Sequence, residues 1–466
     1  MIKLKHLAQC NTVITALLDL EGALPFCSDS RKYAHPSAFV AIPGAKVNPL
    51  DIIDPLLKLR CPYVIYQKDK INDEKVIKLN EQYPHTRFIA VEDSVTFLQE
   101  LTREHIKEWK ELSSKNTVFA ISGSNGKTTH KEMLSFILNT ILPGKVVATE
   151  KNNNNHLGVP LTLLNVNERT EMVVLELGSN HPGEIKVLCD IALPNAGLTT
   201  NIGATHLEFF GNEEKVFQEE GYLYYAIKNN TSGKGFYLIN KDDSFLKSLP
   251  DTTGSISFGE NTEATAQISY LDNGAAIDYK GSELAVSNSY ITGKHNKLNL
   301  ITCAFIAHHF YPESKSEIIR AAGEFKPTKN RSEWIDFQGR SVFLDAYNAN
   351  PSSMKAALVA FRDSIIEQGK VVNESCVVLG DMNELGENAP RYHEELGAFV
   401  RELGFPHVYF VGRYADSYLK GCPSGNKRSS SRDFKSEYRD ECIKNFSIHF
   451  IKGSRSLQLE SLFDIT

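Results

Sequence analysis

The sequence predicts an α/β protein with three domains, and three observations lead to this prediction. The chain has 466 residues, which is more than one compact hydrophobic core accommodates. Short apolar runs of strand type alternate with helical patterns, as is typical of parallel sheets covered by helices. A polar break at residues 113–116 and a new series of strands after residue 326 divide the chain into segments 1–112, 113–325 and 326–466.

The first two segments contain most of the strand-type runs. In the first, these runs are residues 38–42 and 63–66, and a charged helical pattern at residues 97–112 ends the segment. In the second, buried strands are expected at residues 117–122, 172–177 and 236–240, with a helix after the first of them, at residues 128–142. Residues 256–291 alternate as antiparallel hairpins do, with turns at Asp272-Asn-Gly and Lys280-Gly.

The third segment is expected to be a smaller α/β unit in which helices separate the strands. Its strands are expected at residues 342–345, 376–380, 408–412 and 448–451. Residues 424–439 are polar, Ser-rich and charged, which predicts a solvated loop.

The composition is ordinary for a globular protein. Hydrophobic residues make up 41% and charged residues 23%, and the net charge is -6, which argues against nucleic acid as a partner. The eight cysteines form no C-x-x-C pair, and the N-terminus lacks the apolar core of a signal peptide. No apolar run reaches the ~20 residues of a membrane span. We therefore expect a cytoplasmic monomer with no transmembrane segment.

A glycine-rich heptapeptide, Gly123-Ser-Asn-Gly-Lys-Thr-Thr, lies between the strand expected at residues 117–122 and the helix after it. Glycines allow backbone N–H groups to turn toward phosphate oxygens, and the helix N-terminus adds a favourable dipole. In such a phosphate loop Lys127 would contact the outer phosphates and the Thr128 hydroxyl would ligate Mg²⁺. Residue 121 is Ile where the general loop has Gly, so an ordinary strand–turn–helix joint is the alternative. The alignment of strand, glycines, lysine, threonine and helix favours ATP binding.

Two residues after other apolar runs have the chemistry of metal ligands. Glu176 lies at the end of the strand expected at residues 172–177, where a carboxylate is costly to bury unless it binds a metal or a cation. His206 follows another apolar run; alone, it would be interpreted as an ordinary histidine with a satisfied hydrogen bond. After a phosphate loop and Glu176 in a doubly wound pattern, it is a candidate second metal ligand.

In these features the chain resembles the Mur ligases, the amide-forming enzymes of peptidoglycan precursor synthesis. The motifs that carry the likeness extend through nearly the whole chain. They are Ser28-Asp-Ser-Arg, Phe39-Val-Ala-Ile-Pro-Gly, the phosphate loop, Asn154-Asn-His-Leu-Gly-Val-Pro-Leu-Thr, Glu176-Leu-Gly-Ser-Asn-His-Pro-Gly-Glu-Ile, Gly293-Lys-His-Asn-Lys-Leu-Asn, Asp345-Ala-Tyr-Asn-Ala-Asn-Pro-Ser-Ser-Met, Leu379-Gly-Asp-Met-Asn-Glu-Leu-Gly and Lys452-Gly-Ser-Arg-Ser. Tyr-Asn-Ala-Asn-Pro and Asn-His-Pro-Gly-Glu-Ile are similar to the members that add D-alanyl-D-alanine. The Asp-Asn-Pro-Arg of the diaminopimelate-adding members is absent.

The resemblance implies roles for the matching positions. The three segments would be a UDP-substrate domain, a central ATP-binding domain and a C-terminal Rossmann-like domain. The catalytic residues would be Lys127, Glu176 and His206, and the Mg²⁺ ligands would be Thr128, Glu176 and His206; Glu220 is added to both sets as a hypothesis. ATP would be bound by Gly123, Ser124, Asn125, Gly126, Lys127, Thr128, Thr129, Asn299, Arg331 and Asp345. The peptide substrates would be bound by Ser28 and Arg31 at the UDP end, by Asn155 or His156 beside the reacting carboxylate, and by Asn348.

Glu220 marks a departure from the family pattern. The family has a lysine, carbamylated by CO₂, at the position fourteen residues after His206, where this chain has Glu220. Because a glutamate presents a carboxylate directly, the hypothesis is that Glu220 replaces the carbamate and makes the enzyme independent of CO₂. Glu219 is the alternative if the register differs by one residue. A solvated helix face is the other possibility, since this segment is rich in Glu and Lys.

The activity that the resemblance implies is ATP-dependent joining of D-alanyl-D-alanine to UDP-N-acetylmuramoyl-tripeptide through an acyl phosphate. The alternatives are another ligase of the same superfamily, such as a folylpolyglutamate synthetase, a nucleotide-binding relative without catalysis, and a plain phosphate-loop kinase. The N-terminal motifs and the Tyr-Asn-Ala-Asn-Pro run argue against other ligases, and the first and third segments argue against a kinase. Lys127, Thr128, Glu176 and His206, all present together, argue against a loss of catalysis.

Overall fold

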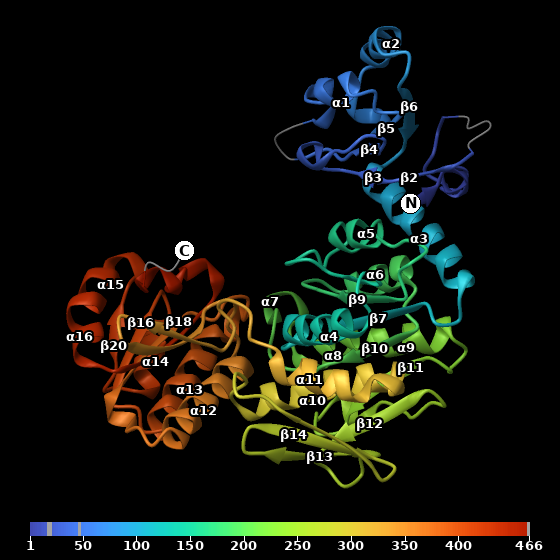
Figure 1. Ribbon diagram of the computed structural model, residues 1–466. Coiled ribbons are helices and arrows are strands. Elements are labelled where there is room, and N and C mark those ends of the chain that lie inside the picture. Colours follow the sequence, from blue (N-terminus) through green and yellow to red (C-terminus); the bar gives the residue numbers. More distant parts are fainter. Residues whose placement is uncertain (16–20, 45–47, 464–466) are drawn as a thin grey trace.

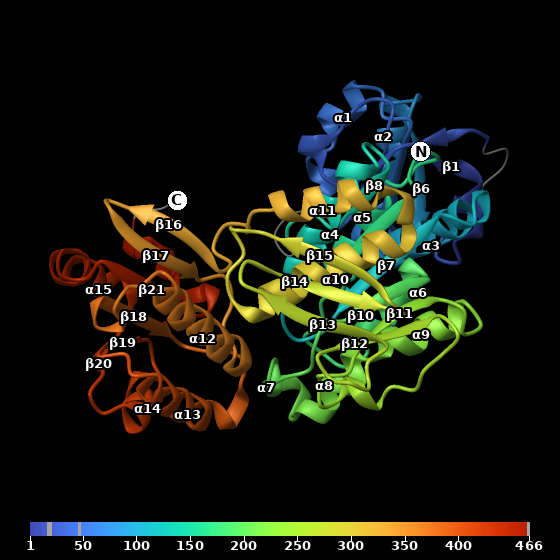
Figure 2. The same cartoon turned by 60° about the horizontal axis from the view of Figure 1, so that its bottom comes forward.

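The computed structural model describes residues 1–15, 21–44 and 48–463, and three lobes follow one another along the chain (Figure 1). The N-terminal lobe contains strands β1 to β6, the central lobe β7 to β15 and the C-terminal lobe β16 to β21. The α/β class with three domains is confirmed, and each sheet lies within one of the three expected segments. The lobe with β16 to β21 lies beside the central lobe and the lobe with β3 to β6 lies beyond α5, as both views show (Figures 1 and 2).

The N-terminal lobe is built on four parallel strands in the order β3-β4-β5-β6. They are β3 (Phe26–Cys27), β4 (Ala38–Ala41), β5 (Tyr63–Gln67) and β6 (Arg87–Val91), with helices α1 (Asp54–Lys58) and α2 (Asp73–Gln82). β1 (Ile2–Lys3) and β2 (Ala23–Leu24) form a separate antiparallel pair. Helix α3 (Ser94–Leu112) leads to the central lobe. It begins three residues before the expected start, because the Asp93 side chain caps it by accepting from the Thr96 N–H at 2.7 Å.

The central sheet has nine strands in the order β15-β14-β13-β12-β11-β10-β7-β9-β8. Its parallel part contains β7 (Thr117–Ser122), β8 (Val146–Ala148), β9 (Met172–Glu176), β10 (Ala196–Thr199), β11 (Phe236–Asn240) and β12 (Ser255–Gly259). The helices of this lobe are α4 (Lys127–Ile141), α5 (Gly158–Leu163), α6 (Glu184–Ala192), α7 (Leu207–Phe210), α8 (Glu213–Glu220), α9 (Tyr222–Asn230), α10 (Lys294–Phe310) and α11 (Lys315–Glu324). Alternate residues of β7 enter separate apolar cores on the two faces, Phe119 with α4 and α10 and Val118 with α6 and α9. Because helices cover both faces of the sheet, the carboxyl ends of its strands remain accessible.

The far end of the central sheet is an antiparallel ribbon, as expected, but it is shorter than the sequence predicts. Strands β13 (Ala266–Leu271), β14 (Gly274–Tyr279) and β15 (Ser282–Ser287) are joined by the two expected turns. The expectation that the hairpins begin at residue 256 is wrong, because β12 pairs in parallel with both β11 and β13. β12 is an interior strand with four of its five residues buried, so its alternation does not mark an exposed face.

The C-terminal lobe has a six-stranded sheet in the order β16-β17-β21-β18-β19-β20, parallel except for β16. The strands are β16 (Glu333–Phe337), β17 (Arg340–Asp345), β18 (Ser375–Gly380), β19 (His407–Val411), β20 (Asn426–Arg428) and β21 (Ile448–Lys452). The helices are α12 (Pro351–Glu367), α13 (Ala389–Glu402), α14 (Ala415–Gly421), α15 (Ser431–Glu437) and α16 (Ile443–Asn445). The solvated loop expected at residues 424–439 is wrong, since β20 and α15 lie there. Phe434 and Tyr438, one helical turn apart, are fully buried and fix this segment to the sheet.

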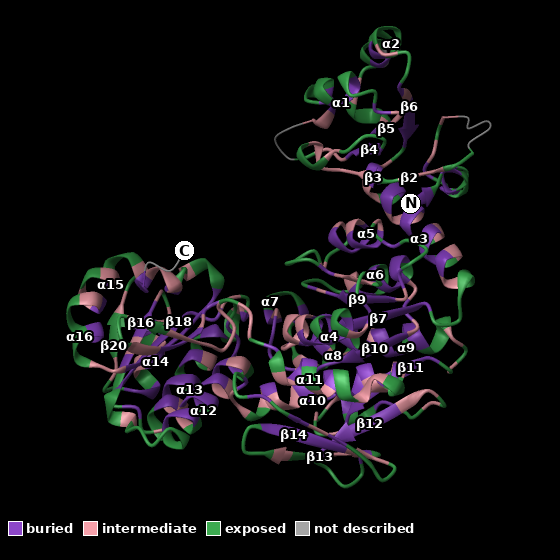
Figure 3. Cartoon of the chain, viewed as in Figure 1, coloured by how far each residue is buried: buried purple, intermediate pink, exposed green. Residues whose placement is uncertain are grey.

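The strands of the three larger sheets are largely buried, and exposed residues concentrate on loops and on the outer sides of helices (Figure 3). Among the residues in the described ranges, no helix is both long and apolar enough to cross a membrane.

Candidate active site

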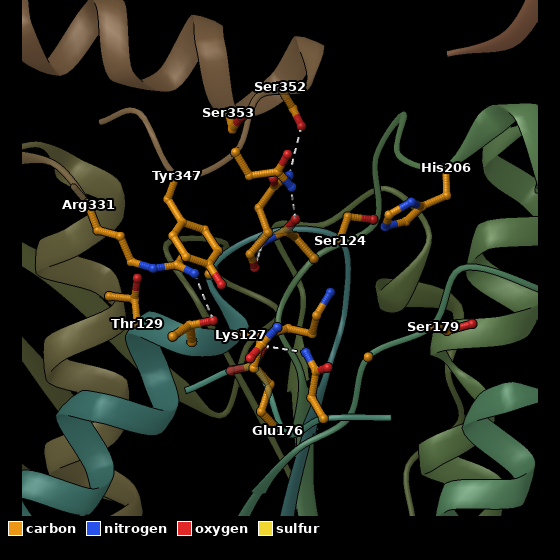
Figure 4. Close-up of a pocket in the computed structure, with 18 of the residues that line it drawn as sticks. Ser124, Lys127, Thr129, Glu176, Ser179, His206, Arg331, Tyr347, Ser352 and Ser353 are labelled. Carbon is orange, nitrogen blue, oxygen red and sulfur yellow. Dashed lines mark hydrogen bonds between the residues drawn. The ribbon is translucent and has the colours of Figure 1, made fainter. Parts of the chain in front are cut away.

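A cavity of about 720 Å³ lies at the carboxyl ends of β7 and β9, where open α/β sheets bind their ligands. The phosphate loop, the loop before α5, the end of β9 and the start of α10 line it from the central lobe. Residues between Arg331 and Ala356, together with Lys452, line it from the C-terminal lobe. In Figure 4, Lys127 and Glu176 lie at the bottom of the cavity, Ser352 and Ser353 lie opposite, and Tyr347 and His206 lie on its two sides. Both lobes therefore complete one site.

The phosphate loop has the backbone that its glycines permit. Gly123 and Gly126 have φ of +120° and +80°, in the left-handed region that disfavours other residues. A Cβ at Gly123 would lie 2.2 Å from the Thr200 hydroxyl, so the loop lies directly on the segment after β10. Two hydrogen bonds brace it there: the Ser124 N–H donates to the Asn201 carbonyl at 2.8 Å, and the Thr200 hydroxyl donates to the Asn125 carbonyl at 2.6 Å. These two bonds fix the backbone of the phosphate loop against the segment after β10.

Lys127 is held over the phosphate loop with Glu220 behind it. The Lys127 ammonium donates to the Gly123 carbonyl, and Nζ lies 3.8 Å from Glu220 Oε1. Glu220 Oε2 accepts the Gly123 N–H at 2.8 Å, and burial raises the pKa of this carboxyl above its usual range. Glu220 does not line the cavity, and its side chain is 1% exposed, so a solvated position is wrong for it.

Glu219 faces the other way. Its carboxylate accepts the Gly183 N–H at 2.6 Å, the Ile185 N–H at 2.7 Å and the Ser179 hydroxyl at 2.9 Å. These bonds satisfy free donors at the N-terminus of α6. Of the two candidate carboxylates, Glu220 is therefore the one that contacts the phosphate loop.

Glu176 has an oxygen available to a cation. Its Oε1 accepts from the Asn154 amide at 2.9 Å, while Oε2 is buried and has no hydrogen-bond partner, although the residue lines the cavity. Glu220 Oε1 is a second buried carboxylate oxygen without a hydrogen bond. Glu176 Oε2, on a residue that lines the cavity next to the phosphate loop, fits Mg²⁺, which takes one or two carboxylates together with phosphates and water, whereas Glu220 lies outside the cavity lining.

His206 lies across the cavity from Glu176 and does not converge with it. Its backbone is left-handed, with φ of +50°, and its Nδ1 lies 2.5 Å from Glu384 Oε2 of the C-terminal lobe. In the part of the chain that is described, no three His, Cys, Asp or Glu side chains gather closely enough to hold a metal by themselves. The predicted metal ligands Glu176, His206 and Glu220 therefore do not converge on one point, and Thr128 lies in the phosphate loop itself.

The predicted nucleotide residues of the C-terminal lobe lie on the same cavity. Arg331 donates to the Thr128 hydroxyl at 3.1 Å, and its guanidinium carbon lies 3.9 Å from the centre of the Tyr347 ring. Asp345 accepts from Lys452 Nζ at 2.6 Å, and Lys452 also donates to the Asn348 carbonyl at 2.9 Å. Buried Lys452 thus fixes the loop between β17 and α12.

Asn125 joins the phosphate loop to this lobe. It accepts from the Asn350 amide at 2.7 Å and donates to the Ser352 hydroxyl at 2.9 Å. Asn350 is also the N-cap of α12, in a capping box with Ser353. The start of α12 is therefore positioned on the phosphate loop.

The predicted substrate residues divide into two groups. Asn155, His156 and Asn348 line the cavity, but the Asn155 side chain caps α5 by accepting the Gly158 N–H at 2.8 Å. Ser28 and Arg31 do not line it; they lie in the N-terminal lobe, where Arg31 pairs with Asp29 at 2.9 Å.

Most of the residues predicted for the nucleotide or the metal are brought together in the cavity, but Gly123 and Glu220 do not line it. Those that line it are Ser124, Asn125, Gly126, Lys127, Thr128, Thr129, Glu176, His206, Asn299, Arg331 and Asp345. The sequence interpretation missed Asn154, Tyr347, Glu384 and Lys452 as site residues. All four lie in motifs already noted, so the signal was present, but their partners lie far away in the sequence.

Comparison with known proteins agrees with this architecture. The Mur ligase middle domain matches residues 121–307, and the Mur ligase glutamate ligase domain matches residues 330–440. The UDP-N-acetylmuramoyl-tripeptide–D-alanyl-D-alanine ligase of Bacillus subtilis is 28% identical over 447 residues, or 93% of this chain and 91% of the relative. The ligase of the same name from Rickettsia prowazekii is 30% identical over 452 residues, or 91% of each chain.

A crystal structure of MurF from Acinetobacter baumannii has the same fold, with a TM-score of 0.80 and 24% identity, and the match covers 99% of this chain and 97% of that one. The sequence match to the Rickettsia prowazekii ligase extends through all three lobes and contains the phosphate loop, Glu176 and His206. The chain belongs to the Mur ligase family.

Proposed function

We propose that this protein joins D-alanyl-D-alanine to UDP-N-acetylmuramoyl-tripeptide with the conversion of ATP to ADP and phosphate. The observation that carries the proposal is the cavity in which Lys127 and Glu176 of the central lobe face Arg331 and Asp345 of the C-terminal lobe. The names of the Bacillus subtilis and Rickettsia prowazekii relatives support the choice of substrates.

The reaction needs two balanced steps. One carboxylate oxygen of the tripeptide bonds to the γ-phosphorus of ATP as the bond from that phosphorus to the β–γ bridging oxygen breaks, which releases ADP. The amine nitrogen of D-alanyl-D-alanine, after loss of its proton, bonds to the acyl carbon. The carbon–oxygen bond to phosphate then breaks, and phosphate leaves with the amide complete. Activation is required because a carboxylate and an amine do not condense by themselves at neutral pH.

The residues of the chain supply position and charge for these steps. The ammonium of Lys127 and the guanidinium of Arg331 line the cavity, where they would stabilise the negative charge that spreads over the phosphoryl oxygens. Mg²⁺, when bound, would neutralise further charge on those oxygens. Thr128 Oγ1 and the unpaired Glu176 Oε2 are the groups best placed to hold it, with His206 at the opposite side. Docking of the C-terminal lobe would exclude water that hydrolyses an acyl phosphate.

The peptide and UDP contacts complete the proposal. The 1–112 segment would bind the UDP portion, with Ser28 and Arg31, and segments 113–325 and 326–466 would be the ATP-binding and Rossmann-like domains. His156, whose side chain is exposed, is a better candidate than the capping Asn155 to contact the reacting carboxylate. We further propose a cytoplasmic monomer.

Glu220 is proposed to take the place of the family's carbamylated lysine. Its buried carboxylate, 3.8 Å from Lys127 Nζ, supports this role. The wild-type protein should then be indifferent to bicarbonate, and a Glu220→Lys variant should recover activity only when bicarbonate is added. Unchanged activity of Glu220→Lys, with no response to bicarbonate, would contradict the replacement.

ADP release tests the proposed function. With ATP and Mg²⁺, we expect release only when UDP-N-acetylmuramoyl-tripeptide and D-alanyl-D-alanine are both present, with the joined pentapeptide detected by mass. ADP release that D-alanyl-D-alanine does not affect, or confirmed ATP binding with no turnover, would instead favour a different amine substrate or a non-catalytic relative.

A further inference from the structure

Asn154 lies in the loop before α5 and makes one side-chain hydrogen bond, to Glu176. Its Nδ2 donates to Glu176 Oε1 at 2.9 Å. Because a carboxylate has only acceptors, the amide nitrogen must be the atom that faces it. The Glu176 backbone is held as well, since its N–H donates to the Thr149 hydroxyl at 3.0 Å. While the backbone N–H and one carboxylate oxygen of Glu176 are held, the other oxygen, Oε2, is buried without a hydrogen-bond partner, and the residue lines the cavity.

Gly178 makes room for this contact. A Cβ at Gly178 would lie 2.7 Å from the Asn154 amide carbon, so any larger residue would displace the amide. The Gly178 N–H also donates to the Asn154 carbonyl at 2.8 Å, which ties the loop to the end of β9. The glycine two residues after Glu176 and the asparagine therefore form a matched pair around the carboxylate.

The loop has a second anchor outside the central sheet. Gln99 of α3 donates to the carbonyl of His156 at 2.9 Å, and Asn155 caps α5. The loop is thus held at the carbonyls of Asn154 and His156, and the Asn154 side chain bonds to Glu176.

We propose that Asn154 is a positioning residue that orients Glu176 so that Oε2 is presented to the metal ion of the bound nucleotide. Partners that orient a ligating carboxylate set metal affinity, and their loss typically costs about 10- to 100-fold in that affinity. This inference rests on the proposed nucleotide and metal binding, and it adds a residue to that site.

The test measures the affinity of the full-length protein, saturated with ADP, for Mn²⁺. The electron paramagnetic resonance signal of free Mn²⁺ reports how much of the metal is unbound. Asn154→Leu, which has nearly the same shape and no donor, should bind Mn²⁺ about 10-fold more weakly. Its affinity for ADP without divalent metal should be unchanged. The matched control is Asn153→Ala in the same loop, because Asn153 is exposed and does not line the cavity; it should behave as wild type.

A second variant reaches the same contact from the other side. Gly178→Ala places a methyl group against the Asn154 amide and should weaken Mn²⁺ binding in the same way. Adding Asn154→Leu to a Glu176→Gln variant should cause no further loss, because the oriented carboxylate is already gone.

Wild-type Mn²⁺ affinity in folded Asn154→Leu or Gly178→Ala would overturn the inference. If neither variant folds, as judged by circular dichroism, the residue pair is structural and the inference is also overturned. Failure of the wild-type protein to bind Mn²⁺ with ADP would instead overturn the proposed nucleotide site.

Discussion

At the scale of single residues, neighbours of identical chemistry have different tasks in this chain. Glu219 caps α6, whereas Glu220 contacts the phosphate loop. Asn155 caps α5, whereas Asn154 holds Glu176. The side chain's partner, rather than its type, decides its task.

These different partners predict that substitution of Glu219 mainly lowers stability, whereas substitution of Glu220 mainly lowers activity. Glu219→Ala removes three hydrogen bonds to a buried carboxylate and should lower the free energy of unfolding by about 2–4 kcal/mol. Glu220→Gln keeps the size of the side chain and should lower ADP formation far more than stability. Urea unfolding and ADP release, measured on both variants, would contradict the assignment if the two phenotypes were exchanged.

His130, in the first turn of α4, predicts a pH dependence of stability. Its Nδ1 donates to the Gly126 carbonyl at 2.9 Å, and burial lowers its pKa to about 4. Between that value and the unfolded pKa of about 6.5, the unfolded chain binds more protons, so stability falls as pH falls. The wild type should lose about 2 kcal/mol from this residue between pH 7 and pH 5.

His130→Asn isolates this contribution, because the asparagine amide can replace Nδ1 as the donor and does not titrate. The free energy of unfolding of this variant should depend less steeply on pH over the same range. Equal slopes for the two proteins would show that the pKa of His130 is the same in the folded and unfolded chains.

At the scale of elements, the local sequence predicts much of the site, because a strand, a glycine turn and a helix are adjacent in the chain. The strands β7 and β9, the start of α4 and the position of Glu176 follow from apolar runs and their ends. The contacts of Asn154, Glu219 and Glu384 could not be predicted from the local sequence. The partner of each lies 22 to 178 residues away in the chain, and only the folded structure brings the two together. The prediction of a loop at residues 424–439 was wrong for a similar reason. The segment is polar in composition, but Phe434 and Tyr438 are buried against distant parts of the C-terminal lobe.

Asn350 has two roles that substitutions can separate: its side-chain oxygen caps α12, and its amide nitrogen donates to Asn125. Asn350→Ala removes the cap and should lower the stability of the C-terminal lobe by about 1 kcal/mol. Asn350→Asp keeps an oxygen for the cap but loses the donor to Asn125, so stability should change by only a few tenths of a kcal/mol. Denaturant unfolding distinguishes them, and equal losses would contradict the capping role.

At the scale of the whole molecule, four side-chain contacts dock the C-terminal lobe on the nucleotide site. They are Arg331 to Thr128, Asn350 and Ser352 to Asn125, and Glu384 to His206. Each has one end on a residue predicted to bind nucleotide or metal, so docking and ligand binding share the same groups.

Loss of these contacts should favour separation of the lobes. We expect a protein carrying both Asn350→Asp and Glu384→Ala to have a larger radius of gyration by small-angle X-ray scattering than the wild type, in the absence of nucleotide. Lys427→Ala, at an exposed ion pair with Asp416, is the control and should scatter as wild type. The same radius for all three proteins would show that these contacts do not hold the lobes together.

Amide formation through an acyl phosphate would transfer one carboxylate oxygen of the tripeptide to the released phosphate, and isotope labelling detects this transfer. UDP-N-acetylmuramoyl-tripeptide labelled with ¹⁸O in its terminal carboxylate would be incubated with the protein, ATP, Mg²⁺ and D-alanyl-D-alanine, and the phosphate analysed by mass. We expect one ¹⁸O atom in the phosphate for each pentapeptide formed. Pentapeptide formed with unlabelled phosphate, or labelled phosphate without pentapeptide, would contradict it.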